Sequence, residues 1–178
     1  MTPQELKALI RTVPDFPRQG VMFRDITTLL ADGRGLTEAV EMIARRADAL
    51  GAGAIAGLEA RGFIFGAAVA SSLRLGFVPV RKAGKLPVPT IGVDYALEYG
   101  EARLEIDPTL IRPGERVIVV DDLIATGGTA LAAVELLRRA GAVVDEALFV
   151  IDLPDLGGAD LLRANGITVE ALMAFEGD

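Results

Sequence analysis

Residues 117 to 129, Val-Ile-Val-Val-Asp-Asp-Leu-Ile-Ala-Thr-Gly-Gly-Thr, constrain the fold of this chain more than any other segment. Residues 117–120 are all β-branched and apolar, and such a run predicts a strand buried on both faces of a sheet. Two aspartates and a Gly-rich turn follow, and the pattern of residues 131–140 then predicts a helix that ends at Gly141. A buried strand that leads through a short turn into a helix is typical of a parallel α/β sheet.

The same alternation of strand and helix fills most of the remaining chain. No linker and no repeat interrupts the 178 residues, so we expect a single domain spanning residues 1–178. A capping box at Thr2–Glu5 predicts a short helix through about Thr12, whereas residues 13–27 show no regular pattern. The predicted fold class is α/β, an open parallel sheet flanked by helices. The other predicted helices cover residues 35–50, 63–73 and 159–164, and the other strands cover residues 54–58, 77–81, 143–151 and 168–173.

One long segment departs from the α/β pattern. Residues 83–94 are rich in Gly and Pro and show no periodicity, while residues 95–99 and 102–106 alternate around Gly100 like an antiparallel hairpin. A long loop with a hairpin inside an otherwise regular domain is more often functional than structural.

The composition excludes several kinds of chemistry. The chain has no Cys and no His, which rules out disulfides, thiol nucleophiles, Ser/His/Asp triads and imidazole acid/base catalysis. Its net charge of −7 argues against general nucleic-acid binding. No apolar run is long enough to span a bilayer and no basic leader opens the sequence, so we expect a cytoplasmic protein without a membrane partner.

The turn after the buried strand predicts a site for a phosphorylated sugar. Ala125, Thr126, Gly127, Gly128 and Thr129, here called the phosphate loop, place small residues, hydroxyls and backbone amides at a helix N-terminus. Such an arrangement suits a phosphate monoester. The preceding Asp121 and Asp122 could accept hydrogen bonds from vicinal hydroxyls or hold a hydrated Mg²⁺. A bare pair of acids or of glycines would more often be a simple turn, but the full order of parts favours the ligand site.

These residues resemble the phosphoribosyl-pyrophosphate motif of the type I phosphoribosyltransferases, and the chain is most similar to the adenine-specific members over nearly its whole length. The resemblance implies that residues 1–30 form a small base-binding hood and that residues 82–106 form a flexible loop and hairpin. It also implies a homodimer, and Mg²⁺ held through the substrate pyrophosphate and water, with no direct metal ligand beyond Asp121 and Asp122. The further matching motifs are residues 15–17, 20–26, 59–63, 81–87 and 97–100.

Positive charges in two segments suit the pyrophosphate. Arg81, Lys82 and Lys85 lie within five residues of each other in an acidic protein. The composition of this segment alone would favour a solvated surface loop, and only the neighbouring motifs favour a site for a polyanion. Arg61 stands in a strand-to-helix turn at the carboxyl end of a sheet strand, where open α/β sheets bind ligands. The resemblance implies that this turn faces the pyrophosphate; a structural ion pair is the alternative.

The resemblance assigns the base site to the hood and to the hairpin. Phe23 is flanked by Met22 and Arg24, and in the family it stacks on the base while backbone groups at the two neighbouring positions read its polar edge. Simple packing is the alternative for Phe23. In the hairpin, Glu98 resembles a mobile carboxylate that closes over the site, and Tyr99 beside it is expected to bind substrate; an ordinary exposed hairpin Glu is equally compatible with the sequence.

The predicted reaction is transfer of the 5-phosphoribosyl group from phosphoribosyl pyrophosphate to adenine, which gives AMP and pyrophosphate. Glu98, Asp121, Asp122, Lys85 and Arg61 are the predicted catalytic residues. Ala125 stands where hypoxanthine-guanine enzymes carry an Asp, which argues against a 6-oxopurine substrate. The alternatives are a phosphoribosyltransferase for another base, and a non-catalytic regulator of the same fold that binds phosphoribosyl pyrophosphate.

Overall fold

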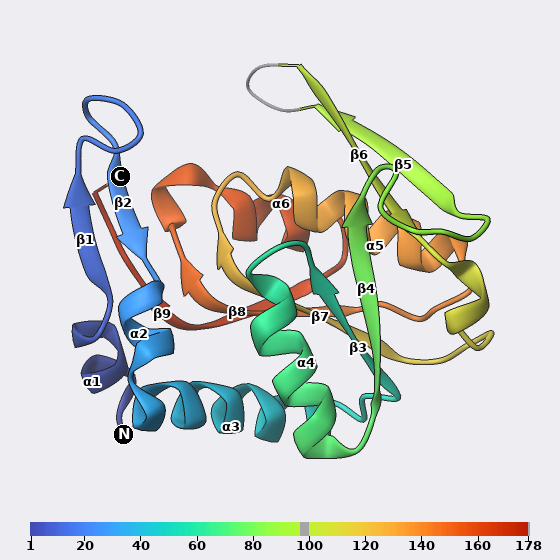
Figure 1. Cartoon of the computed structure of the whole chain (residues 1–178), viewed down its shortest axis with the longest axis horizontal. Coiled ribbons are helices and arrows are strands. Elements are labelled where there is room, and N and C mark those ends of the chain that lie inside the picture. The colour runs from blue at the N-terminus through green and yellow to red at the C-terminus, as the bar shows by residue number, and fades with distance from the viewer. Residues whose placement is uncertain (97–99, 178) are drawn as a thin grey trace.

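A seven-stranded sheet in the order β5-β6-β4-β3-β7-β8-β9 forms the centre of the molecule (Figure 1). The computed structural model describes residues 1–96 and 100–177. Strands β4, β3, β7, β8 and β9 run parallel, and β6 and β5 add an antiparallel hairpin at one edge, so the predicted α/β fold class is confirmed. The strands are β3 (Ala54–Leu58), β4 (Gly76–Lys82), β5 (Ile91–Ala96), β6 (Glu101–Ile106), β7 (Val117–Ile124), β8 (Glu146–Asp152) and β9 (Thr168–Ala174).

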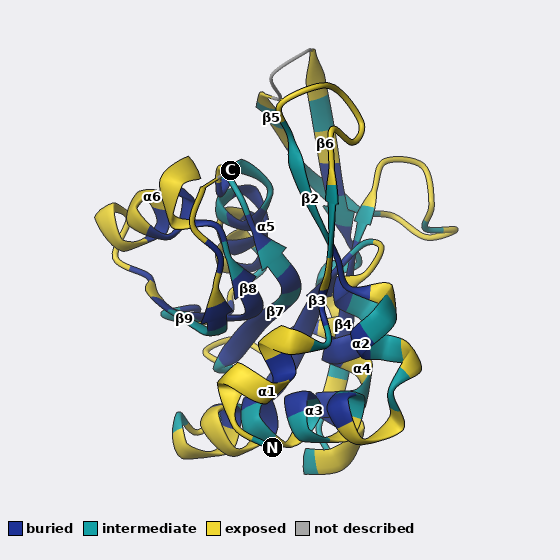
Figure 2. Ribbon diagram, turned by 90° about the vertical axis from the view of Figure 1, so that its left-hand side faces the viewer, coloured by how far each residue is buried: buried dark blue, intermediate teal, exposed yellow. Residues whose placement is uncertain are grey.

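Helices cover both faces of the parallel strands. Strand β7 shows why, because Val117 and Val119 face one hydrophobic core while Ile118 and Val120 face the other. The first core includes helices α5 (Gly128–Arg139) and α6 (Gly158–Ala164), and the second includes α3 (Gly33–Ala49) and α4 (Gly62–Leu73). Figure 2 shows the buried strands between helices whose outer faces are exposed. No helix in the described part of the chain is long and apolar enough to cross a membrane.

The N-terminal segment is more regular than the sequence predicts. The capping box at Thr2 and Glu5 is present, but helix α1 (Pro3–Ala8) ends well before Thr12. Strands β1 (Arg11–Pro14) and β2 (Met22–Asp25) then form a separate antiparallel sheet inside the stretch expected to be irregular, and α2 (Thr27–Ala31) follows. A strand of four residues is too short to show a clear alternation of polar and apolar residues in the sequence. The two strands are stabilised by pairing with each other, which the sequence pattern does not show.

Several further boundaries differ from the sequence prediction, including the start of β8, which lies at Glu146 and not at residue 143. Strand β5 begins at Ile91, inside the Gly- and Pro-rich segment, because it pairs with β6 along its whole length. Strand β7 continues to Ile124 through its pairing with β8, so Asp121 and Asp122 lie within the strand and do not end it. Helix α5 begins at Gly128, directly after the turn. Short 3₁₀ turns at Pro108–Leu110 and Pro154–Leu156 complete the chain.

Candidate active site

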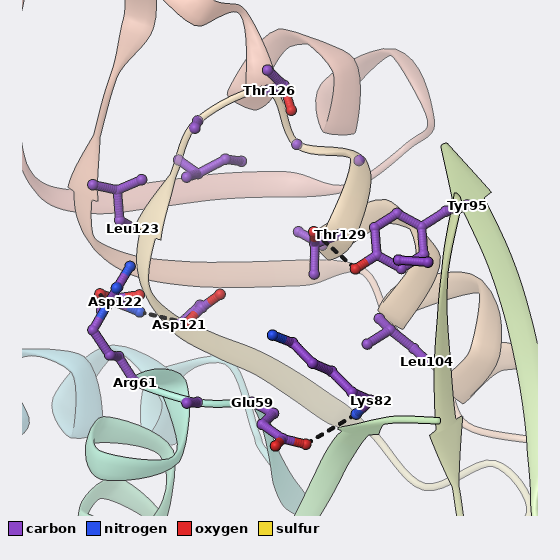
Figure 3. Close-up of a pocket in the computed structure, with 17 residues that line it drawn as sticks. Glu59, Arg61, Lys82, Tyr95, Leu104, Asp121, Asp122, Leu123, Thr126 and Thr129 are labelled. Atoms are coloured by element: carbon purple, nitrogen blue, oxygen red, sulfur yellow. Dashed lines mark hydrogen bonds and ion pairs between the residues drawn. The ribbon is translucent and has the colours of Figure 1, made fainter. Parts of the chain in front are cut away.

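A cavity of about 550 Å³ opens at the carboxyl edge of the parallel strands (Figure 3). Parallel strands end at the same edge of a sheet, so segments that are distant in sequence meet there. The turn after β3 supplies residues 59–61, β7 and the phosphate loop supply residues 121–130, and Lys82 comes from the end of β4. The hairpin closes one side with Tyr95, Ala102 and Leu104.

The phosphate loop bends sharply between β7 and α5. Gly127 precedes the first residue of α5 and has a φ of 83°, a left-handed conformation that a residue with a side chain adopts only with strain. Amides in the first turn of a helix have no carbonyl partner within that helix, so the start of α5 presents donors to the cavity. Thr129 also contacts the hairpin, because its hydroxyl lies 3.4 Å from the hydroxyl of Tyr95. The loop therefore combines backbone amides that have no partner within the helix with a side-chain contact to β5.

The two adjacent aspartates of β7 have different environments. Asp122 is buried, with 5% of its surface exposed, and its carboxylate pairs with the guanidinium of Arg61, which is half-exposed. Burial raises the pKa of Asp121 well above its usual value, and the neighbouring Asp122 charge raises it further. The Asp121 carboxylate packs against Gly62, where an added Cβ would come within 2.5 Å of its Oδ1 atom. Gly62 is therefore needed to leave room for an acid in this wall of the cavity.

Basic residues and one acid form the end of the cavity near β4. The Glu59 carboxylate accepts hydrogen bonds from the Lys82 amide at 3.0 Å and from the Arg81 guanidinium at 3.2 Å. Burial opposes ionisation of Glu59, but these two donors lower its pKa below the ordinary value. The Lys82 side chain points into the cavity in Figure 3. Arg81 and Lys85 lie outside the lining of this cavity. They contact each other, because the Lys85 carbonyl accepts a 3.4 Å hydrogen bond from the Arg81 guanidinium.

A second, more apolar cavity of about 400 Å³ lies beside the first, between the N-terminal hairpin and Arg61. The rings of Phe16 and Phe23 meet edge to face in its wall, with centroids 5.0 Å apart. Arg24 also lines it, whereas Met22 does not. Arg61 lines both cavities, so the two spaces adjoin at its side chain.

Asp25 holds part of the wall of this smaller cavity in place. The Thr27 hydroxyl and the Arg11 guanidinium both bind its carboxylate and, with the Thr27 amide, lower the pKa of Asp25 to about 2. The acid is therefore ionised at any physiological pH. It ties β1 to the start of α2 and holds the segment that carries Phe23.

Comparison with known proteins identifies the family. A model of the phosphoribosyl transferase domain matches residues 27–154. The adenine phosphoribosyltransferase of Novosphingobium aromaticivorans is 69% identical over 99% of each chain. The enzyme of that name from Thermoanaerobacter pseudethanolicus has a crystal structure with a TM-score of 0.92 and 43% identity, covering 98% of this chain and 100% of its own. The chain belongs to the adenine phosphoribosyltransferase family.

The structure of a third relative contains both a purine base and a bisphosphate ligand. The Saccharomyces cerevisiae adenine phosphoribosyltransferase, 38% identical with a TM-score of 0.91 over 96% of this chain and 98% of its own, is complexed with adenine and an imino-altritol bisphosphate. The predicted family, the type I phosphoribosyltransferase fold and the enzyme class, a pentosyl-transferring glycosyltransferase, are all confirmed for this chain.

Within this adenine phosphoribosyltransferase fold, the structure brings most predicted site residues to the two adjoining cavities. The larger one contains Arg61, Asp121, Asp122 and all five residues of the phosphate loop, and the smaller one contains Phe23 and Arg24. Met22, Arg81 and Lys85 lie beside the cavities rather than in their lining. Glu98 and Tyr99 fall outside the described residues, and their predicted roles stay predictions.

Among the residues of the cavity walls that sequence reasoning did not single out are Phe16, Glu59 and Tyr95, and it named Lys82 with its basic neighbours without assigning it to the site. Glu59 and Lys82 stood in matched motifs, but only the contact between β3 and β4 shows which of the basic residues reaches the cavity. Phe16 is half-exposed, with 52% of its surface accessible. The available sequence signal was that Phe16, like Phe23, is an aromatic residue in a segment with no predicted structure.

The described residues contain no cluster of three or more acidic side chains arranged to hold a metal ion. Asp121 and Asp122 both line the larger cavity, but Asp122 is already paired with Arg61. This donor set fits a hydrated Mg²⁺ whose other ligands come from a substrate, because Mg²⁺ is commonly bound by one or two carboxylates together with phosphate oxygens and water.

Proposed function

We propose that the two adjoining cavities transfer the 5-phosphoribosyl group from phosphoribosyl pyrophosphate to adenine, giving AMP and pyrophosphate in a purine salvage reaction. The single observation that best supports this proposal is the position of Arg61, which lines both the polar and the apolar cavity. A phosphorylated sugar in the first and a flat base in the second would meet at this side chain. Adenine is the base that the names of its relatives specify.

The larger cavity would hold the phosphoribosyl group. The phosphate loop would bind the 5'-phosphate through the amides at the start of α5, and Asp121 and Asp122 would accept hydrogen bonds from the ribose hydroxyls. The anomeric carbon gains positive charge as its bond to pyrophosphate breaks, so the two carboxylates beside it also stabilise the transition state. Little proton transfer is needed, which fits a chain without histidine.

Cations at the other end of the cavity would receive the leaving pyrophosphate. Arg61 and Lys82 line this part of the wall, and Arg81 and Lys85 lie close behind it. Mg²⁺ bound with the pyrophosphate and water would supply further neutralisation of its charge. In this structure the Arg61 guanidinium pairs with the Asp122 carboxylate. To contact the pyrophosphate, it would have to bind both anions at once or leave Asp122.

The smaller cavity would hold the base. Phe23 would stack on the purine and Phe16 would pack its edge against the Phe23 ring. Backbone groups of Met22 and Arg24 would read the polar edge of the base, and Glu98 and Tyr99 would approach from the hairpin. In the proposed organisation residues 1–30 are the hood, residues 82–106 the loop and hairpin, and residues 1–178 one domain.

The proposed setting is a cytoplasmic homodimer that binds these small molecules and neither nucleic acid nor membranes. The subunit number is tested by the mass of the purified protein in solution, where a species of one chain would contradict a dimer. The regulator of the same fold would bind phosphoribosyl pyrophosphate without releasing pyrophosphate, so the enzyme assay below separates it from the enzyme.

Pyrophosphate release from phosphoribosyl pyrophosphate, measured with adenine, hypoxanthine, guanine, xanthine and uracil in turn, tests the function. Adenine should be preferred over hypoxanthine by a large factor, because a site that reads an exocyclic amine leaves unpaired groups when a carbonyl replaces it, and such sites discriminate by about 10⁴-fold or more. Comparable kcat/KM values for adenine and hypoxanthine would reject adenine as the specific substrate. Absence of pyrophosphate release with every base would reject catalysis.

A further inference from the structure

The phosphate loop rests directly on the backbone of another helix. The amide of Gly158, the first residue of α6, donates a 2.9 Å hydrogen bond to the carbonyl oxygen of Ala125. Helix α6 is itself anchored in the core, because Ala159 and Leu162 are buried against it. The loop thus meets a fixed surface on the side away from the cavity.

The contact between Gly158 and the loop leaves no room for a side chain. A Cβ atom added to Gly158 would lie 2.7 Å from the amide nitrogen of Gly127 and 2.9 Å from the carbonyl carbon of Ala125. In the reverse direction, a Cβ on Gly127 would lie 2.7 Å from the carbonyl oxygen of Gly158. Real Cβ contacts essentially never fall below 3.0 Å, so one of the two backbones would have to move. No rotamer change can relieve the overlap, since both partners are main-chain atoms.

The requirement for glycine at position 158 comes from this contact and not from its own backbone. Of the two glycines at this turn, Gly157 has a φ of 73°, a conformation that penalises a side chain, whereas the φ of Gly158 is not positive. Alanine would fit the conformation of Gly158 without strain. Its methyl group would instead press on the turn whose amides face the larger cavity.

We propose that Gly158 is a positioning residue for the 5'-phosphate, which acts through the phosphate loop by setting where the amides of residues 125–129 lie. This inference rests on the proposed function, because it takes the loop as the phosphate-binding element. A displacement of a few tenths of an ångström to 1 Å at preorganised donors weakens the interactions that depend on their geometry by about tenfold to 100-fold. The effect should be confined to ligands that carry the 5'-phosphate.

The Gly158→Ala variant tests the proposal, and Gly33→Ala is the matched control. Gly33 is likewise the first residue of a helix, α3, but a Cβ there would meet nothing within 4 Å. For Gly158→Ala we expect the Kd of ribose 5-phosphate and the KM of phosphoribosyl pyrophosphate to rise about tenfold or more, with the Kd of pyrophosphate and the KM of adenine within about twofold of wild type. Gly33→Ala should leave all four constants unchanged. A general loss of structure would move pyrophosphate and adenine binding as well, so the split between the ligands identifies positioning.

Gly158→Ala with an unchanged Kd for ribose 5-phosphate, in a wild-type protein that releases pyrophosphate normally, would overturn the proposal and leave the proposed function intact. If wild type itself forms no AMP, the proposed function fails first. A measurement on wild type covers the case in which the variant does not fold. Ribose 5-phosphate should slow hydrogen exchange of the Gly158 amide, because its acceptor Ala125 belongs to the loop that the ligand orders, and pyrophosphate should not. Equal exchange with and without ribose 5-phosphate would also overturn the inference.

Discussion

Replacing Asp122 by Asn removes one negative charge from the larger cavity while the size of the side chain is kept. In the structure its buried carboxylate binds Arg61, and in the proposed complex it also accepts a ribose hydroxyl. A hydrogen bond to a charged group contributes about 1.5–3 kcal/mol and a neutral one about 0.5–1.5 kcal/mol, so each of these two bonds weakens by about 1–1.5 kcal/mol. Because 1.4 kcal/mol corresponds to a factor of ten, the loss of about 2–3 kcal/mol over the two bonds should lower kcat/KM for phosphoribosyl pyrophosphate by about 30-fold to 140-fold.

Steady-state kinetics at saturating adenine measure this loss, and Asp145→Asn provides its control. Asp145 also pairs with an arginine, since Arg116 lies 3.3 Å from its carboxylate, but this carboxylate is half-exposed and lies outside the lining of the larger cavity. The control should retain wild-type kcat/KM, because exposed ion pairs contribute little. A value for Asp122→Asn within about twofold of wild type would refute the reasoning, since Asp122 would then neither bind the sugar nor position Arg61.

Three further predictions concern other substitutions in the larger cavity and the segments around it. Lys82→Ala should lower turnover and pyrophosphate affinity more than Lys85→Ala does, with adenine KM almost unchanged in both, because Lys82 lines the cavity and Lys85 does not; equal effects in steady-state kinetics would contradict this ranking. Thr126→Leu should raise the KM of phosphoribosyl pyrophosphate by about tenfold, because a branched side chain crowds the amides of the phosphate loop, and a normal KM would exclude the loop as the phosphate site. Asp121→Asn should stabilise the unliganded protein at pH 7 in urea unfolding while it lowers activity. Folding raises the pKa of Asp121 above its ordinary value near 3.9, so wild-type stability falls as the pH rises from about 4 through the raised pKa, and the variant should lose this component of the pH dependence.

The central part of the fold could be predicted because local pattern and tertiary structure agree there. The run of β-branched residues before Asp121 is suited to a strand that is covered on both faces. The Gly-rich turn after it ends the strand and leads directly into helix α5. The carboxyl end of this strand is then the expected place for a ligand site, because the turns that follow the strands of a parallel sheet gather there. Both the fold class and the position of the phosphate loop follow from these local rules.

The N-terminal hairpin and the exact cavity walls could not be predicted for a different reason. Strands β1 and β2 are defined by their pairing with each other, and the position of Phe16 near Phe23 depends on that pairing. The choice between Lys82 and Lys85 is set by the hydrogen bond of the Lys82 amide to Glu59, across two neighbouring strands. Such contacts between distant segments leave no periodic signal in the sequence.

Residues that suit the fold poorly mark the site in this chain. Asp121 interrupts an apolar strand and has a raised pKa, which shows that the folded protein without ligand disfavours its charge. Gly62 and Gly158 each stand at the start of a helix, where other residues form helices better. A Cβ at Gly62 would strike Asp121 in the wall of the larger cavity, and a Cβ at Gly158 would strike the phosphate loop. Helix propensity alone would favour alanine at positions 62 and 158, and burial alone would favour an apolar residue at position 121. The proposed function explains their presence, because a bound sugar phosphate would make use of the carboxylate and of the loop that these glycines leave in place.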